Sequence, residues 1–414
     1  MDDTMVSKDT LASMVDDYVN SYRRMIDLLS SIGKYKLGPI IDELRSVHVA
    51  GSYSLIAREL GIHEDKLRKF IKKASKLGLK FTIDIDLSTI GLMELGIFIE
   101  SIVEITQIPY ISWIKTYVTT HNPIGTMMLY YIPASRRMLV DLIREEFKEK
   151  IITKNKPPPQ IRAYLIYKSM RSQPDFTINP IDKFLRVKWE ELIKELDELN
   201  YKTGIKESRI YWQNIKYSDP IDIIDLIILK ELELNAFTTI NQLAKKYPFA
   251  MRVFSKHLNL HIIKRNCING IFLKTSFTNR LIDSYHLVIL RTNDMDKAAL
   301  LIKYFKYKPW VYAIKWGHEL LNFGKERDEL RPGNFVVIVS IAIPSIYHLY
   351  FAKLLFRLKE LGLANSIEIL SYDTISSKKW GIPYKFYSQA ERTWTLDIEE
   401  NISVLERRIF RYIR

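Results

Sequence analysis

The sequence predicts an α+β protein in which a helical unit and a strand-rich unit each occur twice. Three observations predict this class. Residues 52–79 have the apolar spacing of two helices joined by a glycine turn, strands and amphipathic helices alternate in residues 91–175 and again in 281–380, and an Ile-Pro pair precedes the long helix in both stretches. The pairs are Ile132-Pro133 and Ile343-Pro344. We therefore expect an internal duplication.

The first helical unit is predicted from Ser52 to Leu79, preceded by a helix over residues 37–47. Ser52 or Ser54 can cap the first helix of the pair, and Gly61 permits a sharp turn because glycine adopts positive φ at little cost. The second helix has an apolar face of Leu67, Phe70, Ile71 and Ala74 and a basic remainder of Lys66, Arg68, Lys69, Lys72, Lys73 and Lys76. Residues 80–87 alternate apolar and polar side chains, which predicts a half-buried strand. The order predicts a winged helix-turn-helix, and a helical hairpin with a solvated lysine face is the simpler alternative.

A second, degenerate helix-turn-helix is predicted over residues 238–260, after a helix over 220–233. Ala244 and Phe254 occupy its small and apolar positions, but Pro248 stands where the turn glycine belongs. Asn269-Gly270 lies between apolar runs in residues 262–274, which predicts a β-hairpin as the wing. The basic residues of this copy are Lys245, Lys246, Arg252 and Lys256.

The strand-rich units are predicted to be ferredoxin-like, with the order βαββαβ. In the first, strands are expected over 92–100, 113–120, 126–132 and 161–167, with a short helix within 103–112 and a longer one over 135–150. In the second, strands are expected over 286–291, 310–316, 335–343 and 367–372, helices over 294–307 and 345–361, and a charged insertion over 324–333.

These elements divide the chain into seven predicted segments. They are an N-terminal amphipathic helix (1–34), winged helix-turn-helix 1 (35–90), ferredoxin-like unit 1 (91–175), a helical connector built on a helix over 181–199 (176–218), winged helix-turn-helix 2 (219–280), ferredoxin-like unit 2 (281–380) and a C-terminal helical tail (381–414). A chain of 414 residues is too long for one core, which agrees with several domains.

Charge and composition favour a polyanionic partner in the cytoplasm. The formal net charge is +14, and the single cysteine, Cys267, excludes an intrachain disulfide and suits a small buried residue of a strand. No stretch approaches the ~20 apolar residues of a membrane span, and the acidic, polar N-terminus does not predict a secretory signal. We expect a cytoplasmic, nucleoid-associated protein.

A winged helix-turn-helix followed by a βαββαβ unit resembles the Lrp/AsnC family of archaeal and bacterial regulators, here duplicated over residues 35–172 and 219–376. The resemblance implies that the two α+β units pair, within this chain, into a pseudo-dimer with two unequal DNA-reading heads. It also implies an effector-binding loop with a glycine, for which Gly125 lies at the matching place and Gly317 near it. Whether an effector binds is left open, as is a homodimer through the α+β units or the terminal helices.

Enzyme and metal chemistry are not predicted. The sequence contains no phosphate-binding glycine motif, nucleophile elbow or HExxH motif, so we expect no catalytic residue, cofactor or metal. His257 and His261 are spaced to share a helical face, but no carboxylate or cysteine stands at ligand spacing nearby. Tyr130, Tyr131 and Tyr164 are expected in a core or interface rather than on an RNA-stacking surface.

The expected function is binding of double-stranded DNA, as a transcriptional regulator. His63, Lys66 and Lys69 are placed to reach base edges, and the later lysines of residues 64–78 to hold phosphates. The other predicted DNA contacts are Ser52, Ser54 and Arg68 in the first copy and Lys245, Lys246, Arg252 and Lys256 in the second. Two alternatives stay open: an interaction scaffold of the transcription or replication machinery, and an enzyme resembling the siroheme decarboxylases, which share this pairing of units.

Overall fold

The computed structural model describes most of the central part of the chain. The described ranges are residues 34–101, 111–119, 125–134, 139–147, 160–172, 188–202, 221–273, 284–306, 310–323, 331–343, 347–379 and 382–395, with single positions 31, 149, 308 and 403. Outside these ranges lie most of the expected N-terminal helix within 1–34, most of the tail helix over 396–414, and the tip of the insertion at 324–330. Of the stretch 103–112, expected to hold a short helix, residues 103–110 also lie outside, while Ile111 and Ser112 belong to a strand. The chain is a mixed α+β protein, as expected, and its main sheet is antiparallel and curled.

The first head comprises α2 (Gly38–Leu44), α3 (Tyr53–Glu59) and α4 (Glu64–Lys76), as the sequence predicted. Ser52 caps α3 by accepting a hydrogen bond from the Leu55 amide, and Gly61 turns the chain at φ +63°. Leu67, Phe70 and Ala74 are buried at helical spacing, which fixes α4 against the rest of the head.

The second head comprises α9 (Ile223–Leu234), α10 (Ile240–Lys246) and α11 (Met251–His257), also close to the predicted ranges. Capping boxes begin α9 at Asp222 and α10 at Thr239. After α11 the chain continues as a π-helix, η4 (Leu258–Ile263).

The predicted hairpin at Asn269-Gly270 is wrong. The apolar residues before it belong to η4, and the chain turns at Asn266, whose φ is +52°. Ile268–Leu273 is then a single strand, β6, paired antiparallel with β1 (Phe81–Ile85) of the first head. Gly270 lies opposite Asp84, and a Cβ at Gly270 would come 2.2 Å from the Arg45 carbonyl oxygen. This glycine therefore serves a close backbone approach rather than a turn.

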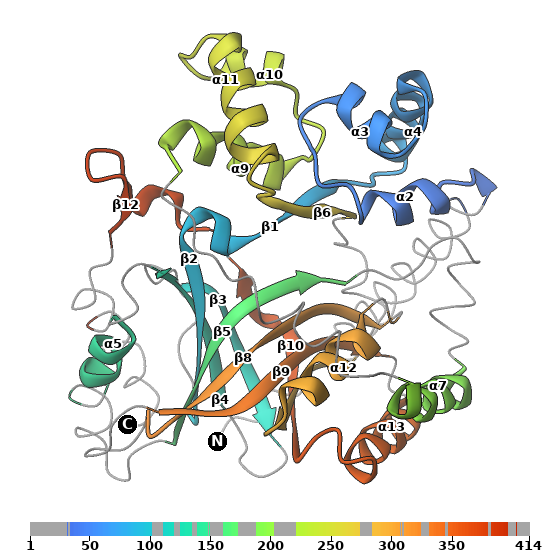
Figure 1. The fold of residues 1–414 in the computed structure, drawn as a ribbon, viewed down its shortest axis with the longest axis vertical. Helices are drawn as coiled ribbons and strands as arrows, with labels where there is room; N and C mark the ends of the chain where they lie inside the picture. The colour runs from blue at the N-terminus through green and yellow to red at the C-terminus, as the bar shows by residue number, and fades with distance from the viewer. Residues whose placement is uncertain are drawn as a thin grey trace, which may run out of the picture.

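The β1–β6 ribbon joins the heads, which share one core. The Ala236 amide donates to the Phe81 carbonyl and the Gly51 amide to the Ala236 carbonyl, while the Phe237 ring packs 5.6 Å from that of Phe81. Every residue of β1 is buried, so the expectation of a half-buried strand is wrong. Its polar positions are covered too, since Thr82 donates to the Glu233 carbonyl of the second head. Figure 1 shows the heads side by side at one end of the molecule.

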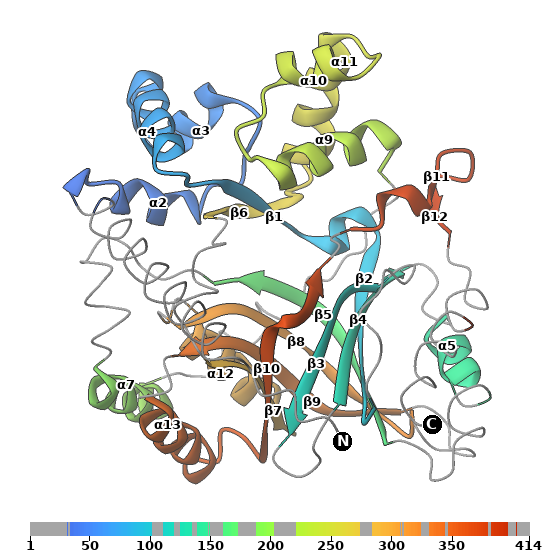
Figure 2. The ribbon, with the colours of Figure 1, turned by 180° about the vertical axis from the view of Figure 1, so that it is seen from behind.

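Below the heads, antiparallel strands form a closed barrel in the order β10-β3-β4-β2-β5-β8-β9-β7 (Figures 1 and 2). The first half of the chain supplies β2 (Leu92–Ile99), β3 (Ile111–Thr119), β4 (Gly125–Pro133) and β5 (Ile161–Arg171); the second supplies β7 (Ser284–Thr292), β8 (Val311–Leu321), β9 (Arg331–Ile343) and β10 (Ser366–Lys379). Both groups have the same internal order: second, third, first, fourth strand. The barrel closes where the fourth strand of each group pairs with the second strand of the other, at β5–β8 and β3–β10.

Alternate residues of the strands face different cores. Met127, Leu129 and Tyr131 of β4 belong to the core that continues into the heads, whereas Met128, Tyr130 and Ile132 face the opposite side, with α5 (Leu139–Phe147). In the second group, α7 (Trp189–Lys202), α12 (Met295–Phe305) and α13 (His348–Glu360) cover the outer face. Figures 1 and 2 place α7 and α13 at the end of the molecule farthest from the heads.

At the C-terminal end of the described chain, β11 (Tyr387–Ser388) and β12 (Thr393–Trp394) form a two-stranded sheet. It returns to the head-proximal end of the barrel, where the Trp394 indole donates to the Ile90 carbonyl of the short 3-10 helix η1 (Leu87–Ile90) at 2.8 Å. In the described part of the chain, no helix combines the length and apolarity needed to cross a bilayer.

His286 of β7 makes the stability of the barrel pH-dependent. Its Nδ1 lies 2.8 Å from Ser371 Oγ, and its Nε2 lies 3.3 Å from Nε2 of His348 on α13. Burial, with the charge of His348, lowers the pKa of His286 to about 4. Between that value and ~6.5 the unfolded chain binds a proton that the folded chain does not, so stability falls as pH falls through this window.

We expect the free energy of unfolding to lose about 2 kcal/mol from this group between pH 7.5 and pH 5. His286→Asn keeps a polar group toward Ser371 but removes the titrating imidazole. As the pH falls over this range, the melting temperature of the variant should therefore fall less steeply than that of the wild type. Thermal melts at matched ionic strength measure this, with His63→Asn, an exposed histidine, as the control. Equal pH dependence in His286→Asn and the wild type would contradict the assignment.

Candidate nucleic-acid interface

Helix α4 presents a basic face to solvent. With about 100° between successive residues, Lys69, Lys72 and Lys76 lie at the centre of the face opposite the buried Leu67 and Ala74. Lys66 and Lys73 lie on one flank and Arg68 on the other. All of these basic side chains are exposed, as predicted from their spacing.

Two of the flanking cations, Lys73 and Arg68, have aromatic neighbours. Lys73 Nζ lies 5.4 Å from the centre of the Tyr35 ring, and Arg68 stacks 4.5 Å from the centre of the Tyr53 ring, which itself packs on Phe237 of the second head. Arg68 also donates to Glu64 at 2.8 Å, so this guanidinium is held toward the junction of the heads. The central lysines are therefore the better candidates for contacting an anion.

The start of α4 is less basic than the sequence interpretation assumed. His63 is the N-cap residue but makes no side-chain cap, and its Nδ1 lies 3.7 Å from the Asp65 carboxylate. Glu64 and Asp65 place negative charge in the first turn, where it interacts favourably with the positive end of the helix dipole. Ser52 is committed to capping α3, and the exposed Ser54 hydroxyl lies 3.1 Å from that of Ser52. The strongest positive potential is thus expected from the middle of α4 onward.

The second head has fewer exposed basic residues among the predicted DNA contacts than the first head, and one of them is engaged in an ion pair. Lys245, Arg252 and Lys256 are exposed on α10 and α11, and the chain between the two helices passes through Pro248. Lys246 is also exposed, but it pairs with Glu231 of α9 at 2.8 Å. Burial opposes ionisation of Glu231, yet the hydrogen bonds from Lys246 and Tyr247 lower its pKa overall. Lys246 therefore holds α10 on α9.

No protein-family model, curated protein sequence or solved structure matches this chain. The functional proposal therefore rests on the geometry of the chain itself.

The structure brings together a cluster that the sequence interpretation missed. His257 on α11 and His261 on η4 lie beside Asp222 and Asp225 at the start of α9. The sequence shows no carboxylate at ligand spacing from these histidines, but the fold brings two beside them. They were missed because they are distant in sequence: Asp225 is 32 residues from His257. The Asp-x-x-Asp pattern before an Ile- and Leu-rich run is a capping signal that could have placed both carboxylates at a helix start.

Other exposed basic residues of the heads were not predicted as contacts, among them Arg58 on α3, Lys80 after α4 and Lys264 after η4. Their signal in the sequence was weak, because none belongs to a helical face with other cations. Each adds positive charge to the head that carries it.

The tyrosines considered for RNA stacking are buried, as expected of a core. Tyr164 is fully buried and accepts a hydrogen bond from Arg291 at 2.8 Å, and Arg291 also donates to Glu319 and Glu368. These residues come from β5, β7, β8 and β10, so the network spans the barrel interior. Gly125 begins β4, the third strand of the first half, where the sequence placed it. Gly317 lies within β8, so its expected place near the loop after the second strand is wrong.

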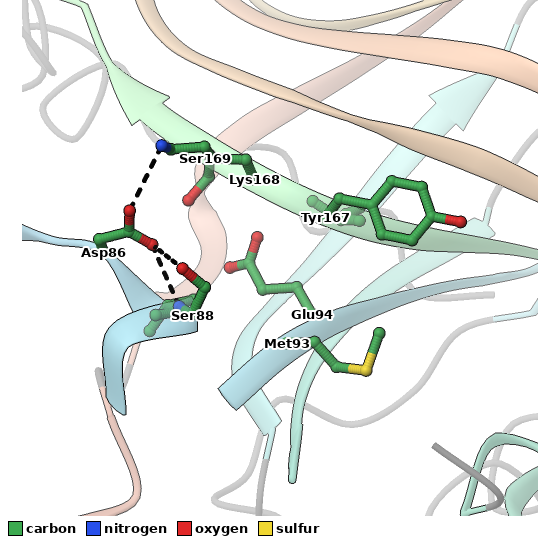
Figure 3. Close-up of a pocket in the computed structure, with 9 residues that line it drawn as sticks. Asp86, Ser88, Met93, Glu94, Tyr167, Lys168 and Ser169 are labelled. Carbon is green, nitrogen blue, oxygen red and sulfur yellow. Dashed lines mark hydrogen bonds and ion pairs between the residues drawn. The ribbon is translucent and has the colours of Figure 1, made fainter. Parts of the chain in front are cut away.

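A small pocket lies where the first head meets the barrel (Figure 3). It lies between η1 and strands β2 and β5. Lys168 pairs there with Asp86 at 3.3 Å, and Glu94 pairs with Lys315 of β8 at 2.6 Å. The Lys168–Asp86 pair connects the head to the barrel, whereas the Glu94–Lys315 pair joins two strands of the barrel below it.

Proposed function

We propose that the chain binds double-stranded DNA, as a regulator of transcription, through α4 of the first head. The observation that carries the proposal is the outward-facing set of lysines on a helix whose other face is anchored in a core. Such a helix can enter a major groove without rearrangement of the head. The net charge of +14 favours the same partner.

The architecture supports the same assignment. The order α2-α3-α4-β1, with β1 in place of a wing strand, supports a winged helix-turn-helix, and the strand order within each barrel half supports a ferredoxin-like unit. The two halves of the chain pair at β5–β8 and β3–β10, and we propose that this pairing corresponds to that of the α+β units in Lrp/AsnC regulators. The chain therefore acts as a pseudo-dimer, with a strongly basic head and a weakly basic one.

Because the heads share a core, they cannot reorient independently. A rigid, unequal pair of heads favours an asymmetric DNA site, in which α4 makes most of the contacts and α11 makes secondary ones. Lys69 and Lys66 are assigned to base edges near the start of α4, and Lys72, Lys73 and Lys76 to phosphates.

The test is fluorescence anisotropy with a labelled random duplex and labelled genomic fragments across a potassium chloride series. Engagement of about five phosphates predicts a slope of roughly −4.5 in log K against log salt. A genomic fragment that resists random competitor DNA would support regulation. Absence of binding at low salt would contradict the proposal and favour the interaction scaffold, whereas a bound tetrapyrrole absorbing in the visible would favour the decarboxylase-like enzyme.

A further inference from the structure

Four side chains of the kinds that bind metals converge where α9 begins and α11 becomes η4. They are Asp222, Asp225, His257 and His261, and one ligand atom from each lies within 4.8 Å of the others. His257 Nδ1 lies 3.2 Å from Asp222 Oδ2 and 3.0 Å from Asp225 Oδ1. His261 Nδ1 lies 3.0 Å from Asp225 Oδ2. Both imidazoles thus direct the same ring nitrogen toward one pair of carboxylates.

The carboxylates are held in place by the helix start. Asp222 Oδ1 accepts hydrogen bonds from the Ile224 and Asp225 amides, and Asp225 Oδ2 accepts one from the Asp222 amide. These bonds leave Asp222 Oδ2 and Asp225 Oδ1 facing the histidines. A ligand whose second oxygen is fixed by backbone amides is already oriented, which is the usual outer-shell arrangement of protein metal sites.

The inner part of the cluster is largely shielded from solvent. The Asp225 side chain is 1% exposed and that of His257 is 12% exposed, so solvent screens this group weakly. Two carboxylates and two imidazole nitrogens at this separation are a donor set that one divalent cation could engage.

The spacing also fits a metal. A tetrahedral zinc ion with bonds of about 2.0 Å holds its ligand atoms roughly 3.3 Å apart. The Nδ1–oxygen distances of 3.0–3.2 Å are close to this value. A mixed imidazole and carboxylate set suits zinc and its first-row neighbours, whereas calcium and magnesium prefer oxygen ligands alone.

We propose that Asp222, Asp225, His257 and His261 bind one divalent transition-metal ion, best matched by zinc, which ties η4 and α11 to α9 in the second head. In the metal-bound form each histidine carries its proton on Nε2, so that Nδ1 is free to coordinate. The site is independent of the DNA-binding proposal, since it lies on the side of α11 that faces α9.

The experiment uses the full-length chain, stripped with EDTA, exchanged into metal-free buffer and titrated with zinc chloride against a chromophoric chelator. We expect one equivalent to bind, and the melting temperature to rise as zinc is added, because the metal stabilises only the folded state. Cobalt at one equivalent should give the intense visible absorption of a tetrahedral site. His261→Asn should weaken zinc binding by at least about 100-fold, while His63→Asn should bind as the wild type does.

The outcomes separate a metal site from a network of hydrogen bonds. Failure of the folded wild type to bind a stoichiometric equivalent would overturn the proposal, as would equal binding by the wild type and the His257→Asn/His261→Asn double variant. Because Asp222 and Asp225 cap α9, the histidines are changed first. If the double variant does not fold, the cobalt spectrum of the wild type tests the proposal instead. A weak, octahedral spectrum that is the same in His261→Asn would overturn the proposed metal site.

Discussion

Replacement of Lys69 and Lys73 by glutamate is expected to abolish DNA binding by the first head. The double change places one anion at the base edges and one where a phosphate would approach, and it reverses charge on the exposed face of α4. We expect affinity to fall at least about 100-fold at 0.1 M salt, and the slope of log K against log salt to become shallower by about one unit, for the phosphate contact of Lys73. Fluorescence anisotropy with the random and genomic duplexes measures both quantities.

The matched control places the same charge change at the other end of the molecule. Lys353 and Lys359 are exposed on α13, so Lys353→Glu/Lys359→Glu alters the net charge equally. If DNA were attracted only by overall charge, both double variants would bind equally weakly. Retained binding in the α13 variant and its loss in the α4 variant would localise the interface.

Loss of folding would be a trivial cause of lost binding, and the structure argues against it. Lys69 and Lys73 are exposed, and the contact of Lys73 with the Tyr35 ring is worth about 0.5–1 kcal/mol at an exposed site. The α4 variant should therefore melt within a few degrees of the wild type. Unchanged DNA affinity in a folded α4 variant would refute the assignment of the interface.

Substitution of Gly317 by alanine is expected to destabilise the barrel severely. Gly317 lies in β8 opposite Ile166 of β5, at one of the two seams that join the halves. A Cβ there would lie 1.8 Å from the Leu165 carbonyl oxygen and 2.9 Å from Ile166 Cα. Backbone atoms cannot rotate away as side chains can, so the strands must separate. We expect a loss of about 3 kcal/mol or more.

Gly96→Ala provides the matched control. Gly96 is also in a barrel strand, but its added Cβ would meet the ends of flexible side chains, Met127 Cε at 2.8 Å and Leu129 Cδ2 at 3.3 Å. We expect a smaller fall in melting temperature for Gly96→Ala than for Gly317→Ala, measured by circular dichroism. Equal falls in melting temperature would contradict the larger penalty that we assign to a backbone clash at the β5–β8 seam.

The sequence was sufficient for features with a local cause. Periodic apolar residues predicted α4 with its lysines outward, because a helix sets the direction of each side chain from its neighbours alone. The same reasoning predicted the strands of both barrel halves to within a few residues. The lysines of α4 form one face because of their spacing, so this part of the candidate interface was readable without tertiary structure.

The pairing of distant segments was decided by the tertiary structure. Asn269-Gly270 has the local preference of a hairpin, yet β6 pairs with β1 because the preceding residues are helical and Gly270 fits against the Arg45 carbonyl. Lys246 belongs to a predicted basic face, but the carboxylate of Glu231 on another helix engages it. Such outcomes depend on contacts between elements, which single-sequence periodicity does not encode.

Helix faces, caps and strand positions were determined by the sequence alone, because each depends on residues within a few positions of one another. The closure of the barrel, the common core of the heads and the meeting of Asp222 and Asp225 with His257 and His261 were decided only by the tertiary structure. Each of these requires segments far apart in the chain to come within a few ångströms, and the free energy that holds them there comes from burial and pairing in the assembled fold.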